Sequence, residues 1–272
     1  MELVKEKQTI INWLDKFGVT NYTINDNYTI DVDGNVDISF KNIKELPSFI
    51  QFGIIKGAFK CNGNCLTTLK GMPKIVKGYF DCSSNNLTTL EGAPEEVGID
   101  FDCYNNKLIS LEGAPKKISR YFDCSYNKLT TLEGAPEVVK IFLCHYNDII
   151  SLKGAPKIVK EDFTCSHNKL TTLEGAPKAV CNFTCSHNKL TTLEGAPKIV
   201  KGYFDCSHNN LISLEGAPRV VGGYFTCSNN KLKSFKGIPK VVKREFYCTE
   251  NLIQFLENEV KEICQVRKDI IV

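Results

Sequence analysis

Apolar positions along most of the chain recur with a period of 20 or 21 residues. Each unit places a Phe two residues before a Cys, with polar residues beside them, and further Leu, Ile or Phe residues five and eight positions after the Cys. The period-two alternation predicts a short strand with Phe and Cys facing inward. A repeat of this length predicts a solenoid, in which each unit buries its apolar face against its neighbours. The cysteines of this column are Cys61, Cys82, Cys103, Cys124, Cys144, Cys165, Cys185, Cys206, Cys227 and Cys248.

Three other features recur with the same period. An Asn follows each Cys by three residues, where we expect its side-chain amide to bond to backbone groups of the turn. The segment LEGAP is too rich in Gly and Pro for a regular helix, so we expect a largely non-helical convex side. The 21-residue units carry one more residue between Val and Phe than the 20-residue units, which predicts a small β-bulge before the strand.

These patterns predict an α/β-type solenoid: a curved horseshoe with a parallel β-sheet on its concave face and helix-containing caps at both ends. We expect an N-terminal cap of a helix and a β-hairpin over residues 1–35, then about ten to eleven units of 20–21 residues over 36–258. Residues 259–272 are expected to form a C-terminal capping helix. The whole chain is expected to form one structural domain.

The predicted caps rest on local patterns. Residues 21–39 alternate around Asp33–Gly34, which indicates a hairpin turn there. The segment 36–47 is interpreted as a degenerate first unit, with Phe40 one period before Cys61. Helical periodicity in 3–17 places one apolar set on a single face, and 251–272 does the same. These two sets are Val4, Ile10, Ile11, Leu14 and Phe17, and then Phe255, Leu256, Val260, Ile263 and Cys264.

The 20-residue units read V-x-x-F-x-C-x-x-N-x-L-x-x-L, as in VKIFLCHYNDIISL, which begins at Val139 and has Ile at the first Leu position. Over residues 36–258 this pattern resembles the leucine-rich repeat, with Phe and Cys in two of the usual Leu places. It is most similar to the short-repeat leucine-rich proteins of bacteria and large tailed phages, whose units also read NxLxxLEGAPxxV. The resemblance implies a binding scaffold, which in phage or pathogen settings is often aimed at host proteins.

The charge is nearly balanced, with 34 Lys+Arg against 31 Asp+Glu, so the total charge favours neither nucleic acid nor membrane. No run approaches the ~18 apolar residues of a membrane span, so no membrane partner is expected. The cysteine column is interpreted as a row of small buried apolar residues. Closely spaced thiols suit a reducing compartment, which predicts a cytoplasmic protein, in the host cytoplasm if the protein is viral.

Candidate chemistry is sparse. His167, His187 and His208 share one column, in which stacked imidazoles allow metal binding or coupled titration, although copying of an exposed residue by repeat duplication is the favoured interpretation. No metal site and no cofactor are predicted. No nucleophile–base pair, phosphate loop or paired-carboxylate cleft emerges, so no catalytic residue is predicted and the protein is expected not to be an enzyme.

One unit departs from the pattern on the predicted concave face, which is the usual binding face of such a solenoid. Ile141 and Leu143 occupy outward positions that other units fill mostly with Tyr, Asp or Thr. An exposed apolar patch ringed by Tyr and charge is typical of a protein-binding surface, although drift in one copy explains the same residues. The predicted partner-binding residues are Ile141, Leu143, His145, Tyr146, Tyr121, Asp123, Tyr126, Tyr104, Asp102 and Asp81.

Two alternatives remain open at this stage. The first is a nucleic-acid or nucleotide binder, which would use outward tyrosines together with a basic C-terminal patch. A nucleic-acid partner is less favoured than a protein partner. A self-associating structural component is the other alternative. The residues of the basic patch are Lys231, Lys233, Lys236, Lys240, Lys243 and Arg244.

Overall fold

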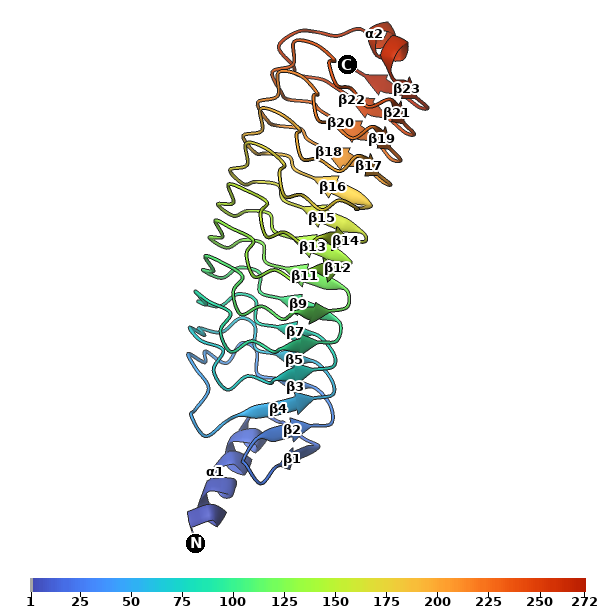
Figure 1. Ribbon diagram of the computed structural model, residues 1–272. Coiled ribbons are helices and arrows are strands. Elements are labelled where there is room, and N and C mark those ends of the chain that lie inside the picture. The colour runs from blue at the N-terminus through green and yellow to red at the C-terminus, as the bar shows by residue number, and fades with distance from the viewer. Residues whose placement is uncertain (1) are drawn as a thin grey trace. The chain divides into compact units, whose positions relative to one another are not determined.

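The computed structural model describes residues 2–272, with side chains from Lys5 onward. The chain divides into two compact units, one of Met1–Lys128 with Gly134–Pro136 and one of Leu129–Glu133 with Glu137–Val272. In each unit the chain winds in successive coils that add strands to two sheets (Figure 1). We call the sheet built from the Phe-x-Cys strands the main sheet and the other the side sheet.

The first unit begins with α1 (Glu2–Lys16) and an antiparallel pair, β1 (Tyr22–Ile24) and β2 (Ile30–Val32). From β2 onward its strands pair in parallel. Its side sheet continues through β4 (Phe52–Ile55), β6 (Ile75–Val76), β8 (Glu96–Val97) and β10 (Lys117–Ile118). Its main sheet contains β3 (Val36–Asp37), β5 (Phe59–Lys60), β7 (Phe80–Asp81), β9 (Asp100–Asp102) and β11 (Tyr121–Asp123).

The second unit repeats this arrangement, again with parallel pairing. Its main sheet contains β13 (Ile141–Leu143), β15 (Asp162–Thr164), β16 (Asn182–Thr184), β18 (Phe204–Asp205), β20 (Phe225–Thr226), β22 (Phe246–Tyr247) and β24 (Ile270–Ile271). Its side sheet contains β12 (Val138–Val139), β14 (Ile158–Val159), β17 (Ile199–Val200), β19 (Val220–Val221), β21 (Val241–Val242) and β23 (Gln265–Val266), with Ala179 and Val180 bridging β14 to β17. The short helix α2 (Glu257–Ile263) precedes β23. Neither helix within residues 2–272 has the length and apolar composition needed to cross a membrane.

The core behind the main sheet is a column of stacked aromatic rings. Each Phe of the repeat is fully buried, and neighbouring rings within a unit lie nearly parallel, as for Phe80–Phe101 at 5.5 Å and Phe204–Phe225 at 5.6 Å between centroids. The cysteines form a second buried column, and all are free thiols. Thiols such as that of Cys103, whose Sγ lies 3.2 Å from the carbonyl of Asp123, donate to the next coil's backbone. The predicted buried cysteine column is therefore confirmed.

The Asn column joins successive coils through its side chains. In the coil of Asn188, the amide Nδ2 donates to the carbonyls of Cys165, Cys185 and Ser186 at 3.0–3.3 Å. Its Oδ1 accepts the backbone N–H of Leu170 at 3.0 Å. One buried side chain thus satisfies backbone groups of two coils, which confirms the predicted role of the column and extends it between coils.

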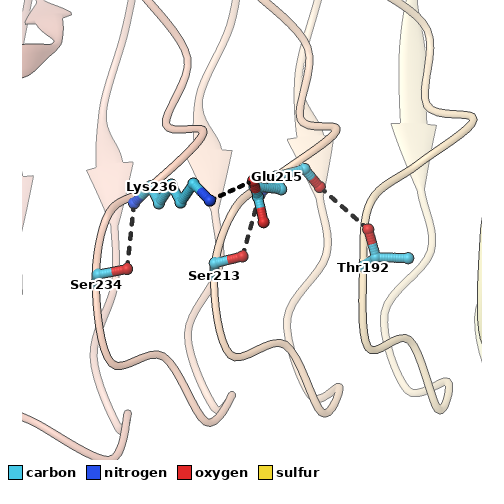
Figure 2. A network of polar contacts seen from close by, with 5 residues as sticks. All are labelled: Thr192, Ser213, Glu215, Ser234 and Lys236. Atoms are coloured by element: carbon cyan, nitrogen blue, oxygen red, sulfur yellow. Dashed lines mark hydrogen bonds and ion pairs between the residues drawn. The ribbon is translucent and has the colours of Figure 1, made fainter.

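The side of each coil opposite the main sheet is made of turns, and residues 18–256 contain no helix. Ser and Thr hydroxyls accept backbone N–H bonds at the LEG turn, as Ser213 does from Glu215 at 3.5 Å. Figure 2 shows that the Glu215 carboxylate also pairs with Lys236 of the next coil, at 2.9 Å. The parallel-strand solenoid with few helices is confirmed in both units.

The predicted β-bulge before the strand is wrong, because the Val column forms the side sheet. From Val76 of β6 to Phe80 of β7 the chain advances four positions, whereas from Val139 of β12 to Phe142 of β13 it advances three. The extra residue of the longer repeats therefore lies in the corner between two strands. Each Val is buried, and its backbone pairs with the Val of the next coil, as Val221 does with Val242.

The N-terminal segment differs from expectation in two details. The hairpin turn lies at residues 25–29, and Asp33–Gly34 lies between β2 of the side sheet and β3 of the main sheet. The register pairs Val36 with Phe59, so Ile38, which is fully buried, takes the Cys position instead of the exposed Phe40. Ile10 and Leu14 of α1 are buried as predicted, while the side chain of Val4 lies outside the described residues.

The predicted capping helix over 259–272 is wrong in extent, since α2 ends at Ile263. Residues 265–271 add one more turn of the solenoid, with β23 on β21 and β24 on β22. The backbone N–H of Gln265 donates to Lys240 at 2.9 Å, and that of Cys248 donates to Ile271 at 2.8 Å. This pairing provides backbone bonds and partly buries Val266 and Ile270, which outweighs the helical periodicity of the segment. Phe255, Val260 and Cys264 are buried as predicted, but Leu256 and Ile263 are exposed.

Candidate binding surface on the main sheet

The outer face of the main sheet consists of the side chains that alternate with the buried Phe and Cys. Because the strands are in register within each unit, equivalent residues of successive coils lie side by side. Each outward column is therefore a row of neighbouring groups about 4.8 Å apart. The predicted partner-binding residues fall partly in the first unit and partly in the second, and each set is described within its own unit.

Three of the predicted partner-binding residues form an acidic row in the first unit. Asp81 pairs in register with Asp102, and Asp102 with Asp123. Each carboxylate also accepts the backbone N–H two residues later, at 2.9 Å from Ser83, 2.9 Å from Tyr104 and 2.8 Å from Ser125. The row thus fixes the ends of the strands as well as supplying charge to the surface.

Burial and the neighbouring carboxylates change the acidity of Asp102, at the centre of this row. Burial raises the pKa of Asp102 to about 7, and the neighbouring carboxylates Asp123, Asp81 and Asp100 act in the same direction against the Tyr104 N–H bond. Asp123 is buried, and its Oδ2 accepts a 2.7 Å hydrogen bond from the hydroxyl of Tyr121. The centre of the row is therefore a shielded group that titrates near neutral pH.

Tyrosines border the acidic row. Tyr104 and Tyr126 meet edge to face at 5.3 Å between centroids, and Tyr126 is exposed at a positive φ of 53°. The Arg120 guanidinium pairs with Asp100 at the start of the same strands. In the first unit the predicted Asp and Tyr residues thus form one contiguous polar and aromatic surface.

The second unit carries the apolar pair. Ile141 and Leu143 are on the outer face of β13, as predicted, and both are half-buried. Leu143 pairs in register with Thr164 of β15. His145 lies next to the exposed Tyr146, with 5.7 Å between their ring centroids. The four predicted residues of this unit are therefore brought together.

Tyr146 begins a stacked column of rings that includes the three predicted histidines. Ring centroids are 4.1 Å apart for Tyr146–His167, 4.2 Å for His167–His187 and 4.1 Å for His187–His208. All four residues have φ of 52–53°, a left-handed conformation in which His and Asn are enriched. Burial lowers the pKa of His167 and His187, and the neighbouring imidazoles lower it further.

The stacked geometry does not favour metal binding. The rings of His187 and His208 are 10° from parallel, so their nitrogen lone pairs, which lie in the ring planes, do not converge on one point. Across the part of the chain that is described, no group of three or more His, Cys, Asp or Glu side chains is arranged to hold a metal ion.

The residues of the predicted basic patch lie on different parts of the coil. Lys231 and Lys233 follow the Asn turn, and Lys236 forms the Glu215 ion pair on the opposite side. Lys240 and Lys243 flank β21 of the side sheet, with Arg244 next to them at the corner. The structure therefore does not bring these six residues together as one patch.

An aromatic group near the C-terminal end was not among the predicted site residues. Tyr203 and Tyr224 stack at 4.9 Å with their planes 2° apart, and Tyr247 meets Tyr224 edge to face at 6.2 Å. A hollow of about 290 Å³ adjoins them, lined by Asn182, Gly202, Tyr203, Gly222, Gly223, Tyr224 and Arg244. Burial raises the pKa of Tyr224 to about 12. The signal in the sequence is the recurrence of Tyr three residues before Cys at Tyr203 and Tyr224, whereas Tyr247 directly precedes its Cys.

The fold and this surface define a class of protein: a parallel-strand β-solenoid built from sequence repeats, with an open outer sheet face. No protein-family model matches the chain. No curated protein sequence matches it. Among solved structures, the chain is similar to YopM from Yersinia enterocolitica WA-314, with 17% sequence identity and a TM-score of 0.40, over 81% of this chain and 67% of that one.

Proposed function

We propose that the protein is a non-enzymatic scaffold that binds a protein partner through the outer face of the main sheet. The observation that carries the proposal is the pair Ile141 and Leu143, which are apolar and half-exposed at outward positions that the next two coils of the second unit fill with Asp, Thr and Asn. Partly exposed apolar side chains among aromatic and polar groups are typical of the energetic centre of a protein interface.

The rest of the face supports the same function. In the first unit the Asp81–Asp102–Asp123 row supplies negative charge, and Tyr104 and Tyr126 supply rigid aromatic contact area. A partner with a basic surface suits the acidic row. In a phage or bacterial setting, we propose that the partner is a host protein in the cytoplasm.

The test is affinity capture from host cytosol with the wild-type chain and the Leu143→Arg variant, read by mass spectrometry. A charge at the centre of an interface typically costs 2 kcal/mol or more, so we expect at least about thirtyfold weaker capture of a specific partner. The matched control is Ile150→Arg, because Ile150 belongs to the same coil and is 63% exposed away from this face. A partner that is lost equally with both variants, or retained by both, would contradict the proposal.

A second candidate, binding of a nucleotide or single-stranded nucleic acid, is favoured by the Tyr203–Tyr224 stack beside Arg244. Stacked aromatic rings and a guanidinium suit a base and its phosphate. We expect a fluorescent oligonucleotide to bind with an affinity that falls steeply with salt, and Tyr224→Ala to weaken that binding by about tenfold. Tyr79→Ala, at the equivalent position of the first unit, is the control. Binding unaffected by Tyr224→Ala excludes this site.

A further inference from the structure

The side sheet of the second unit presents an exposed aliphatic row. Its outward residues pair coil to coil, so they form an unbroken line of small and β-branched side chains. Ile199 is 59% exposed, Ile158 44% and Val138 41%. The residues that alternate with them, from Val139 to Val242, are buried. The complete row is Val138, Ile158, Ala179, Ile199, Val220 and Val241.

Basic side chains flank this row on both sides. Immediately before the aliphatic residues stand Lys157, Lys178, Lys198, Arg219 and Lys240, and all five are exposed. Beyond the buried Val column stand the exposed Lys140, Lys160, Lys201 and Lys243. We call these two rows and the aliphatic row between them the side-sheet stripe.

Backbone hydrogen bonds tie the strands of the stripe together from coil to coil. Arg219 donates its N–H to Lys198 at 2.8 Å, Lys240 donates to Arg219 at 2.9 Å, and Lys243 donates to Val221 at 2.9 Å. The basic residues of successive coils are therefore held at the spacing of the strands, about 4.8 Å. The backbone is ordered without a partner, so little backbone conformational entropy is lost when the surface binds.

Few carboxylates oppose this charge. Glu137, at the first position of the basic row, pairs with Lys157 at 2.9 Å, and Glu161 follows Lys160 at the corner. Glu174, Glu194 and Glu215 lie on the LEG turns and bound the stripe on that side. The nearly balanced charge of the whole chain thus conceals a local excess of positive charge.

From this arrangement we infer that the side-sheet stripe binds the surface of an anionic phospholipid bilayer. Each Lys or Arg near such a surface strengthens binding about fivefold through attraction to anionic headgroups. Exposed aliphatic side chains between basic ones enter the boundary between headgroups and acyl chains, while the long Lys stems reach back to the phosphates. A nucleic acid offers phosphates but no comparable place for the aliphatic row, and the stripe contains no aromatic residue to stack on bases.

This inference does not depend on the proposed function, because the stripe belongs to the side sheet and the proposed partner-binding residues belong to the main sheet. The two surfaces can therefore be disabled separately.

The test is co-sedimentation of the full chain with vesicles of phosphatidylcholine alone or with roughly 30% phosphatidylserine. We expect binding only to the vesicles that contain phosphatidylserine, and a large loss of binding between about 0.1 M and about 0.5 M salt. The Lys198→Glu/Lys201→Glu/Lys240→Glu variant should lose at least about tenfold in affinity. The Ile158→Ser/Ile199→Ser variant should lose severalfold at unchanged charge.

The matched control is Lys169→Glu/Lys189→Glu/Lys231→Glu, which changes the net charge equally at exposed positions after the Asn turn. Circular dichroism checks that each variant is folded. Absence of vesicle binding, or an equal loss in the control, overturns the inference. Two further outcomes exclude a bilayer as the partner of the stripe. One is vesicle binding that the Ile158→Ser/Ile199→Ser variant does not weaken, and the other is a stripe that binds single-stranded DNA but not vesicles.

Discussion

At the scale of single residues, the place of a residue in the coil determines its burial and its acidity, which its residue type alone does not determine. Asp102 and Asp162 are both aspartates on strands of the main sheet, but only Asp102 lies in the strand-centre column between two other carboxylates. Its burial and these neighbours raise its pKa to about 7. The periodic sequence predicted the column and its outward direction. It did not predict the degree of burial, which depends on how bulky neighbours such as Tyr104 and Tyr121 pack over the sheet.

The raised pKa of Asp102 predicts a pH dependence of stability. The unfolded chain loses this proton near pH 3.8, whereas the folded chain keeps it up to about pH 7. Between these values the folded state binds more protons, so the contribution of Asp102 to the free energy of unfolding falls as pH rises from about 4 to about 7. We expect Asp102→Asn, which retains an oxygen for the Tyr104 N–H, to stabilise the protein at pH 8 by on the order of 2 kcal/mol relative to its effect at pH 4.

Urea unfolding of both proteins across this pH range measures the effect. Asp162→Asn serves as the comparison, because Asp162 is a main-sheet aspartate of the second unit that does not lie between two other aspartates. Its in-register neighbour on one side is Asn182, which donates to it at 2.6 Å. If the free energy of unfolding changes between pH 4 and pH 7 by the same amount in the wild type and in Asp102→Asn, the raised pKa of Asp102 is contradicted.

At the scale of elements, the sequence predicted the main sheet but not the side sheet. Phe and Cys alternate over enough residues to reveal a strand, whereas each side-sheet strand is two or so residues long and contributes a single buried Val per coil. Such strands exist because the neighbouring coil supplies their backbone partners, and this information is absent from the local pattern. The same cause explains β23 and β24, where pairing with the preceding coil overrides helical periodicity.

The asparagine column gives the prediction at this scale. Asn188→Ala removes three donated bonds and leaves the buried N–H of Leu170 without its acceptor. Leaving a buried backbone donor unsatisfied costs about 1–3 kcal/mol, and we expect a total loss of about 3 kcal/mol in the free energy of unfolding, measured with urea. As a control we take Asn210, which lies in the turn of the next coil but outside the asparagine column. Asn210→Ala should lower the free energy of unfolding by less than about 1 kcal/mol. Equal effects of the two substitutions would show that the column is not what joins the coils.

At the scale of the whole molecule, the period of the sequence predicted the class of fold, since ten in-phase copies of one pattern admit few architectures. The candidate site was predicted only in part. Outward positions follow from the period of two, so Ile141 and Leu143 could be placed on the sheet face in advance. The stacking of Tyr146 with the histidines, the Tyr203–Tyr224 pair and the side-sheet stripe depend on how coils are placed against one another. That placement is set by contacts between coils, which the local sequence pattern does not reveal.

The asparagine bridges also have a mechanical consequence. Because each one ties a coil to the coil before it, the bridges are in series when the chain is stretched from its ends, so they bear the same force and give way one at a time. Each released coil of 21 residues lengthens the tether by roughly 70 Å. A force–extension trace is therefore expected to show a sawtooth of nearly equal steps, whose spacing reports the repeat length directly.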